Sequence, residues 1–256
     1  MLGTLDDRLV IYTGIILTAT GASRCIELEA YASLTLLPRV ASLGVAVAVE
    51  VPVVAQACGM GMVGVVEDVE ARVWGRGLYY SSPLLGGLLS RVVMDAYAGE
   101  GKLPVERLRS PAAGTETLIS SLEGSTAVLG TAVMPLYDLS GLWAVVVRLE
   151  KPLERRLAEA VYTNIGALEK AAYDTLDNPV DMIDSISERL AKLTGSRRLQ
   201  RLRERLLKQG AIAVGLDIHG SHLIVVAEDA ETAYTISALN RELGDRVEAP
   251  IAVPTA

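Results

Sequence analysis

Several residue types are absent or rare in this sequence. It has no phenylalanine, two cysteines (Cys25 and Cys58) and two histidines (His219 and His222) among 256 residues. Two cysteines in a chain of this length do not make a disulfide scaffold, and their spacing does not match a zinc site. Asparagine and glutamine are also scarce, which is compatible with a heat-adapted source because both amides are thermally labile.

Positive charge is in the minority, since the formal net charge is -7. This disfavours a nucleic-acid-binding protein that depends on broad neutralisation of phosphates. The first eight residues carry two aspartates in place of a basic segment, which predicts no secretory signal and a cytoplasmic location. The longest apolar stretch, residues 41–66, is interrupted by Glu50, Pro52 and Gln56, so buried strands are predicted there and not a membrane span.

What the chain does have is enough apolar material for a substantial core, because half of its residues are hydrophobic. Strand patterns dominate the first part. Residues 25–37 alternate between apolar and polar side chains, and residues 9–19 and 63–74 are rich in β-branched residues. Residues 43–57 form a valine and alanine run that Pro52 interrupts, which predicts either two consecutive strands or an edge strand with a bulge.

Helical spacing follows. We predict a helix over residues 84–97, a short helix over residues 116–122, and strands over residues 126–134 and 142–149. Beyond residue 151 apolar residues recur at helical spacing and predict one amphipathic helix on the stripe Leu153, Leu157, Val161, Ile165 and Leu168. Further helices are predicted at 181–193 and 197–208, and a closing unit has strands at 211–216, 222–227 and 246–251 around a helix at 230–243.

Four segments have glycine, alanine, serine or proline at spacings that matter for phosphate chemistry. They are residues 30–49, 83–91, 114–125 and 210–222. In the second of them, glycines and a serine precede a helix, where backbone N–H groups and the helix dipole favour an anion. In this order the four segments resemble the motifs of the GHMP small-molecule kinases. The opening strands also resemble those of archaeal ribofuranosylaminobenzene-phosphate synthases and, more loosely, pantoate kinases.

The resemblance implies an α+β, two-lobed fold. Its N-terminal lobe, residues 1–135, would be mainly strands and would contain the phosphate loop. Its C-terminal lobe, residues 136–256, would be an α+β sandwich. The activity implied is transfer of the γ-phosphate of ATP, with Mg²⁺, to a hydroxyl of a small metabolite, and the implied partner is that metabolite, without nucleic acid or membrane. A homodimer is left open.

The same resemblance implies the site residues. The phosphate loop that binds ATP would contain Pro83, Gly86, Gly87 and Ser90, although Leu88 and Leu89 stand where the family has small residues. Thr117 occupies the place of the family's catalytic aspartate, and Glu116 beside it supplies a carboxylate that could orient or deprotonate the substrate hydroxyl. The other interpretation of Glu116 is an exposed residue in the first turn of a short helix.

The last motif implies a substrate-binding turn formed by Asp217, His219 and Gly220. Asp217 with the two histidines could also bind a divalent metal, but turn polarity explains these residues equally well and two imidazoles do not complete a site. We therefore predict no metal site there. The basic residues of 189–208 form either a solvated helix face or an electropositive surface for an anionic ligand.

Two other functions are compatible with the sequence. Loss of the serine cluster and of the catalytic aspartate favours a non-catalytic protein that keeps the fold for regulation or assembly. A transferase similar to the ribofuranosylaminobenzene-phosphate synthases is the second alternative, and binding of phosphoribosyl pyrophosphate in place of ATP would distinguish it.

Overall fold

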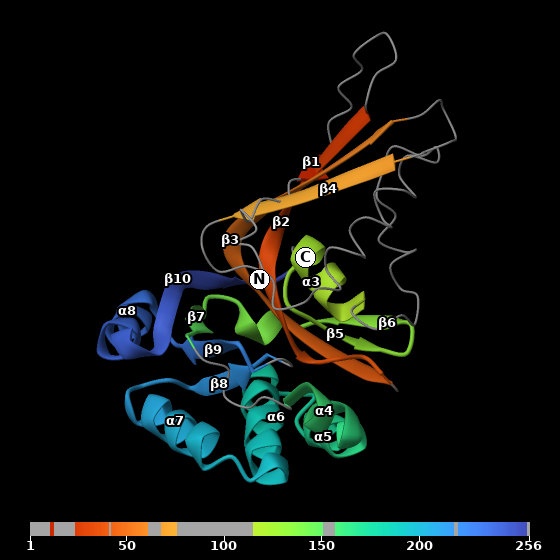
Figure 1. Cartoon of the computed structure of the whole chain (residues 1–256). Helices are drawn as coiled ribbons and strands as arrows, with labels where there is room; N and C mark the ends of the chain where they lie inside the picture. Colours follow the sequence, from red (N-terminus) through yellow and green to blue (C-terminus); the bar gives the residue numbers. More distant parts are fainter. Residues whose placement is uncertain are drawn as a thin grey trace, which may run out of the picture.

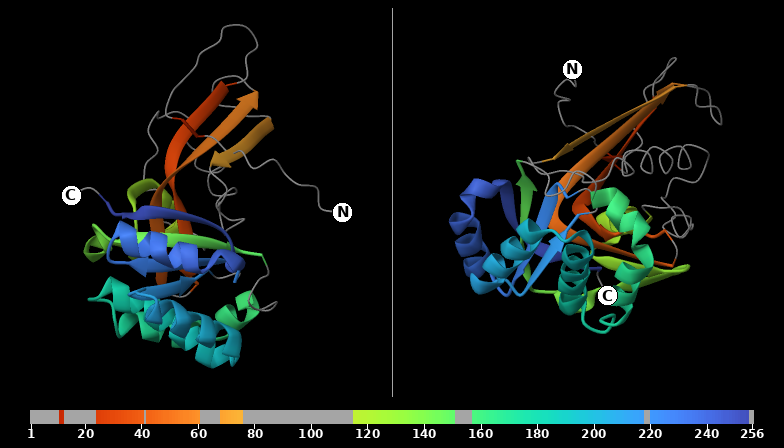
Figure 2. Two further views of the ribbon diagram at one scale, coloured as in Figure 1. Left: turned by 90° about the vertical axis from the view of Figure 1, so that its left-hand side faces the viewer. Right: turned by 60° about the horizontal axis from the view of Figure 1, so that its bottom comes forward.

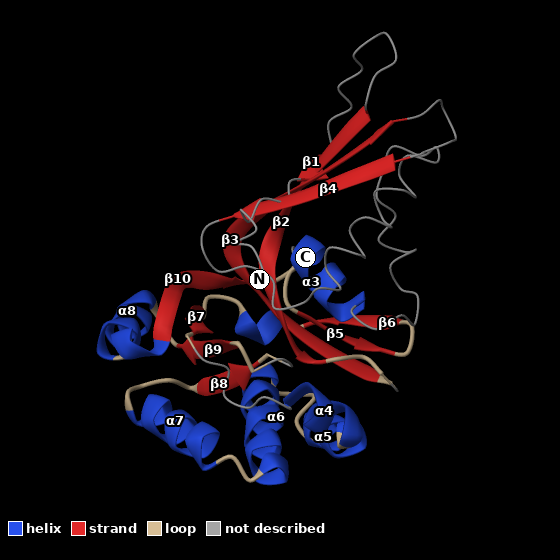
Figure 3. Cartoon of the chain, in the orientation of Figure 1, coloured by secondary structure: helices blue, strands red, loops and turns tan. Residues whose placement is uncertain are grey.

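The computed structural model describes residues 11–12, 24–40, 42–60, 68–75, 115–150, 157–217 and 220–254. Within these ranges the chain is an α+β protein, as predicted, and its strands form one ten-stranded sheet. Figures 1 and 3 show the helices within residues 157–208 gathered on one side of the body, while the strands within residues 24–75 extend away from it. The predicted helix at 84–97 lies outside the described residues, as does most of the predicted strand at 9–19, of which β1 (Ile11–Tyr12) is described.

β3 (Leu43–Met60) is the central strand of the first half. One of its edges pairs with β2 (Arg24–Leu37), to which β1 is also added. Its other edge pairs in succession with β5 (Thr126–Leu129), β10 (Gly244–Ala252) and β4 (Asp68–Gly75). Because β10 comes from the end of the chain, this pairing continues the sheet from the first half into the second.

Pro52 lies in one continuous β3 and at a bulge, as one of the two alternatives expected, but β3 is paired along both edges and is not an edge strand. Tyr31 pairs with Pro52, but the next residue of β2, Ala32, pairs with Val49, so the ladder shifts register at this point. A bulge is one of the few places in a sheet where proline is tolerated. The part beyond the bulge, which we call the distal arm, consists of Arg24 to Tyr31 of β2, Pro52 to Met60 of β3, β1 and β4 (Figures 1 and 2).

The second half continues the sheet in the order β10–β7–β9–β8, with β7 (Trp143–Leu149), β8 (Ala213–Leu216) and β9 (His222–Ala227). β7 is antiparallel to both β9 and β10, so those two strands, joined by α8 (Ala230–Leu239), run parallel with β7 between them. α6 (Pro179–Thr194) and α7 (Arg197–Lys208) confirm two predicted helices. Local signals specify α6 well, because Asn178 caps its first turn and Gly195 ends it at φ 63°.

Three sequence predictions need correction. The strand predicted at 126–134 is a hairpin of β5 and β6 (Ala132–Pro135), turned at Gly130 with φ 58°. The single helix predicted beyond residue 151 is two described helices, α4 (Leu157–Thr163) and α5 (Ile165–Tyr173), separated at Asn164. The helix predicted at 230–243 ends at Leu239 and continues as the 3₁₀ turn η2 (Arg241–Leu243). The predicted lobe boundary falls between β6 and the 3₁₀ turn η1 (Tyr137–Leu139).

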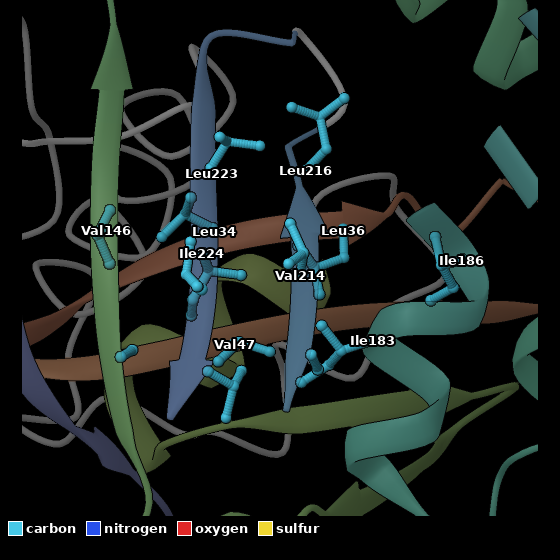
Figure 4. Packing of buried hydrophobic residues seen from close by; sticks show 14 of the residues in the cluster. Leu34, Leu36, Val47, Val146, Ile183, Ile186, Val214, Leu216, Leu223 and Ile224 are labelled. Carbon is cyan, nitrogen blue, oxygen red and sulfur yellow. The ribbon is translucent and has the colours of Figure 1, made fainter. Parts of the chain in front are cut away.

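The main core lies between β2, β3, the β7–β9–β8 strands and α6 (Figure 4). β2 contributes Leu34 and Leu36, and α6 contributes Ile183 and Ile186; each of these side chains is at most 4% exposed. Burial of such side chains is the dominant favourable term in folding. The core therefore joins the β2–β3 pair to the C-terminal sheet.

A buried carboxylate fixes the start of β3 against α5. One oxygen of Glu169 accepts hydrogen bonds from the backbone N–H of Ser42 at 2.9 Å and of Leu43 at 3.0 Å, and from the Ser42 hydroxyl at 3.3 Å. Tyr173, one turn further along α5, donates to the same hydroxyl at 3.0 Å. These contacts join residues far apart in the sequence and satisfy backbone donors that the ladder leaves unpaired.

Replacing Glu169 with alanine is expected to lower the free energy of unfolding by about 2 kcal/mol, because two backbone donors lose a charged acceptor. Its exposed neighbour Lys170 is the matched control, since alanine there should change stability by less than about 0.5 kcal/mol. Urea denaturation of both variants measures the difference. Equal stability of the two variants would contradict the role given to Glu169.

Candidate functional site

The two catalytic candidates lie in the first turn of α3 (Thr115–Glu123), which packs on β2, β3 and β5. Glu116 is 0% exposed and Thr117 is 1% exposed. The interpretation of Glu116 as a solvent-exposed helix residue is therefore wrong. Its position in the first turn of a short helix suggested exposure. The contact of α3 with the sheet, which the sequence does not reveal, buries this turn.

Thr117 uses its hydroxyl within the protein. The hydroxyl is hydrogen-bonded to that of Thr35 on β2, and the Thr117 carbonyl accepts from the Ser121 hydroxyl at 2.9 Å. Further along α3, the Ser120 hydroxyl donates to the Ala46 carbonyl of β3 at 3.4 Å. The serine and threonine pattern that aligned this segment with a kinase motif thus also attaches the helix to the sheet.

Glu116 shares its surroundings with a buried arginine. A Cβ placed on Gly44 would lie 2.7 Å from Cβ of Arg39 and 3.1 Å from Cβ and Cγ of Glu116, so both side chains pass directly over this glycine. Arg39 is only 5% exposed. The side chains of Arg39 and Glu116 are therefore both buried beside the same backbone position.

The Thr35–Thr117 contact gives a quantitative prediction. Either single change to valine leaves one buried hydroxyl without its partner and should cost about 1 to 3 kcal/mol. The double change removes both hydroxyls and should cost less than the two single changes together. Denaturant unfolding of the four proteins in this cycle measures the coupling, and strictly additive costs would show that the two hydroxyls do not interact.

The predicted substrate turn joins β8 to β9, and Asp217 organises it. Asp217 is 0% exposed, and its Oδ1 accepts from the backbone N–H of Ser221 at 2.7 Å and of His222 at 3.1 Å. Its Oδ2 accepts from the Ser221 hydroxyl at 3.0 Å. Gly220, with φ 68°, donates its N–H to the Asp217 carbonyl at 2.9 Å, while His219 lies outside the described residues.

Sequence reasoning missed Ser221, which links Asp217 to a buried imidazole. Its hydroxyl lies 3.0 Å from Nδ1 of His222, and Oδ2 of Asp217 lies 3.5 Å from the same nitrogen. An ionised carboxylate only accepts, so the Ser221 hydroxyl donates to Asp217 and its oxygen can accept from Nδ1 of His222 when that nitrogen carries a hydrogen. Nε2 of His222 is buried and has no hydrogen-bond partner among the described residues.

The register of the C-terminal strands extends this group into a polar row. His222 is opposite Arg148 on β7, and Arg148 is opposite Asp245 on β10. The Asp217 N–H donates to the His222 carbonyl at 3.0 Å, which places Asp217 at the other end of the row. Directly opposite residues share a face of a sheet. Four residues with ionisable side chains therefore lie side by side across the sheet on one face: Asp217, His222, Arg148 and Asp245.

The structure does not bring the two groups of predicted residues onto one surface. Leu36 packs toward Gly215 of β8, within 3.0 Å of a Cβ placed there, whereas its neighbour Thr35 faces α3. Successive strand residues point to opposite faces, so β2 lies between the α3 turn and the β8 strand. Pro83, Gly86, Gly87 and Ser90 lie outside the described residues.

The basic segment is partly neutralised. Arg203 of α7 forms a two-point contact with Asp184 of α6, with Nε 2.9 Å from Oδ1, and this hydrogen bond raises the pKa of Arg203 above its ordinary value. Lys192 pairs with Glu188 on α6, and Arg205 pairs with Glu242 at 3.0 Å. The remaining basic residues of α7 are exposed and include Arg197, Arg198, Arg201 and Lys208. The solvated-face interpretation therefore accounts for part of the segment.

The described residues contain no group of three or more histidine, cysteine, aspartate or glutamate side chains that could hold a metal ion. No described helix combines the length and the apolar character needed to cross a bilayer.

Comparison with known proteins identifies the fold. No family model and no curated protein sequence matches the chain. Solved structures do match. Mevalonate kinase from Methanococcus jannaschii is 10% identical with a TM-score of 0.58, covering 93% of this chain and 100% of that one. L. major mevalonate kinase in complex with R-mevalonate is also 10% identical, with a TM-score of 0.58 and coverage of 95% and 99%.

A third match, described as a phosphotransferase related to the CoA biosynthesis pathway, is 17% identical with a TM-score of 0.56. It covers 89% of this chain and 96% of its own. The chain therefore has the α+β fold of the GHMP small-molecule kinases over most of its length. This agrees with the fold that the four sequence segments implied.

Proposed function

We propose that the protein is a GHMP-type small-molecule kinase that transfers the γ-phosphate of ATP to a hydroxyl of a small metabolite. The observation that carries this proposal is the fold, which the chain shares with mevalonate kinases over more than nine-tenths of its residues. The order of the four sequence segments supports it independently, because those segments lie in the same order as the kinase motifs.

In this proposal the nucleotide phosphates are held by the loop that contains Pro83, Gly86, Gly87 and Ser90. Glycine permits close approach of backbone N–H groups to phosphate, and the helix predicted to follow would supply its positive end. Mg²⁺ would neutralise charge on the phosphates when bound. The described residues contain no cluster of three potential metal ligands, so we assign no Mg²⁺ ligand to them.

Catalysis would then depend on positioning and charge stabilisation, which dominate phosphoryl transfer. Glu116 and Thr117 are buried against β2 and β3, so their proposed contribution is to hold the first turn of α3 in place. Asp217 and Gly220 would shape the substrate turn, together with His219. Asp217 does this through its hydrogen bonds to Ser221 and His222.

The second candidate is a protein that keeps the fold without catalysing phosphoryl transfer. The observation that favours it is the burial of both catalytic candidates, because an enzyme of this kind needs a group that reaches the substrate hydroxyl. The two candidates differ in one measurable property. The first consumes ATP in the presence of a substrate, and the second does not.

An ADP-release assay with Mg-ATP and a panel of small hydroxy acids and polyols tests the proposal. We expect substrate-dependent ADP formation by the wild-type protein and at least a tenfold lower rate for Gly87→Val, whose side chain would obstruct approach to the phosphates. The Lys170→Ala variant is the matched control, since Lys170 is exposed on α5, and it should retain the wild-type rate. Nucleotide binding without ADP formation for any substrate would favour the non-catalytic candidate.

A further inference from the structure

The only two cysteines of the chain, 33 positions apart, meet in the distal arm. In the antiparallel ladder of β2 and β3, Cys25 is directly opposite Cys58. The pairing around them is continuous, because the register runs without a shift from Arg24 opposite Gly59 to Tyr31 opposite Pro52. The two positions are therefore fixed relative to each other by the whole ladder of the distal arm.

This placement matches the geometry of a disulfide. Directly opposite residues of antiparallel strands have Cα atoms about 4.5 to 5.5 Å apart. Disulfide-bonded cysteines have Cα atoms about 4.4 to 6.8 Å apart, and cysteines separated by more than about 7 Å cannot be bridged without backbone movement. Opposite residues also share a face of the sheet. Position and face both permit a bond between the two sulfur atoms.

We propose that Cys25 and Cys58 form a cross-strand disulfide, which makes the distal arm a site of reversible oxidation. The co-reactant is a small-molecule disulfide. One cysteine thiolate attacks it, forms a mixed disulfide and releases one small thiol. The second cysteine then attacks the mixed disulfide and releases the other small thiol. The two protein thiols are oxidised, and the small disulfide is reduced to two thiols by the same two electrons.

The alternative use of a cysteine pair is metal binding. Two thiolates provide half of a tetrahedral zinc or iron–sulfur site, and the residue that β4 places opposite Cys58 is Glu70. A carboxylate and two thiolates still lack a fourth ligand. The next pair of polar residues on β2 and β3, Glu27 and Gln56, is two residues further along the strands and not beside the cysteines. The disulfide requires no additional ligand, so the ladder favours it.

The position of the disulfide in the distal arm determines which part of the fold it stabilises. The buried core described above lies on the other side of the Pro52 bulge, around Leu34, Leu36 and Val47. A slip of one residue in the distal arm would move every side chain there to the other face. A disulfide between the two strands prevents such a slip and restricts the unfolded chain between residues 25 and 58. Oxidation should therefore stabilise the distal arm.

The experiment oxidises the purified full-length protein with glutathione disulfide and quantifies thiols under denaturing conditions. We expect no free thiol, a mass about 2 Da below that of the reduced protein, and a cross-linked peptide pair containing Cys25 and Cys58 after non-reducing digestion. The melting temperature of the oxidised protein should exceed that of the reduced protein by roughly 5 °C. The variant with both cysteines changed to serine should melt like the reduced wild-type protein under either condition.

A shifted pair provides the matched control. In the variant that combines Cys58→Ser with Gln56→Cys, the second thiol stays on the same face but moves two residues along β3, which places the Cα atoms about 7 to 8 Å apart. This variant should form mixed disulfides with glutathione in place of an internal bond. Two free thiols, two glutathione adducts or only intermolecular dimers in the oxidised wild-type protein would overturn the proposal, as would an internal bond formed equally well by the shifted pair.

Discussion

Replacing Gly124 with alanine is expected to lower the free energy of unfolding by about 3 kcal/mol or more, because the new methyl group has no space. A Cβ at this position would lie 2.5 Å from the carbonyl carbon of Val253 and 2.7 Å from the nitrogen of Pro254. Both contacts are with backbone, so no side chain can move away. The backbone at Gly124 also has φ 108°, a conformation that L-residues with a side chain rarely adopt.

The close approach of Gly124 to the backbone of Val253 and Pro254 allows hydrogen bonds between the end of α3 and β10. Immediately after Gly124, the Ser125 N–H donates to the Ala252 carbonyl at 2.8 Å, and the Ser125 hydroxyl donates to the same carbonyl at 2.7 Å. Gly124 therefore lets the end of α3 contact the last strand of the chain. Urea denaturation measures the effect. Gly130→Ala is the matched control, since φ is 58° there but nothing lies within 4 Å, and it should cost only about 1 kcal/mol. Similar costs at the two positions would contradict the steric explanation.

The second large effect is expected at Asp217. Changing it to alanine removes the acceptor of two backbone N–H groups and one hydroxyl, all within a turn where Asp217 itself is fully buried. Each buried donor left without a partner costs about 1 to 3 kcal/mol, and the two Ser221 donors are only partly buried, so a total loss in the lower part of the summed range, about 3 to 5 kcal/mol, is expected. The loss should appear in the denaturation midpoint of the whole protein, because β8 and β9 belong to the main core.

Two variants separate the contributions at this turn. Asp217→Asn keeps one oxygen that can accept from the two backbone N–H groups, so it should lose less stability than alanine. Ser221→Ala leaves those two bonds intact and removes only the hydroxyl, so it should cost about 1 kcal/mol. If alanine at position 217 were no more harmful than alanine at position 221, the capping role of Asp217 would be disproved.

The parts of the fold that local patterns specify could be predicted from the sequence. Alternation predicted β2, and helical spacing of apolar residues predicted α6 and α7 within two residues at each end. The errors lie where a tertiary contact or a single residue determines where a helix or strand ends. The apolar stripe that crosses Asn164 continues without interruption, but the Asn164 side chain donates to the Ala160 carbonyl at 2.8 Å and the helix ends there.

In the candidate site, too, local sequence patterns were informative and tertiary contacts could not be predicted. Alignment with the kinase motifs identified the segments that contain Thr117 and Asp217, and it correctly implied the fold. It could not show that Glu116 is buried, because that depends on the packing of α3 against Arg39 and Gly44, more than 70 positions earlier in the chain. Nor could it show that Ser221 connects Asp217 to His222, because a serine in a turn has no distinctive sequence signal.

Nucleotide binding tests the central proposal most directly. Mg-ATP at millimolar concentration is expected to raise the melting temperature of the wild-type protein, since a ligand at 100 times its Kd adds about 2.7 kcal/mol of stability. The shift should be much smaller for Gly87→Val, measured against the same variant without nucleotide. An unchanged melting temperature of the wild-type protein at saturating Mg-ATP would contradict the proposal that this fold serves a kinase here.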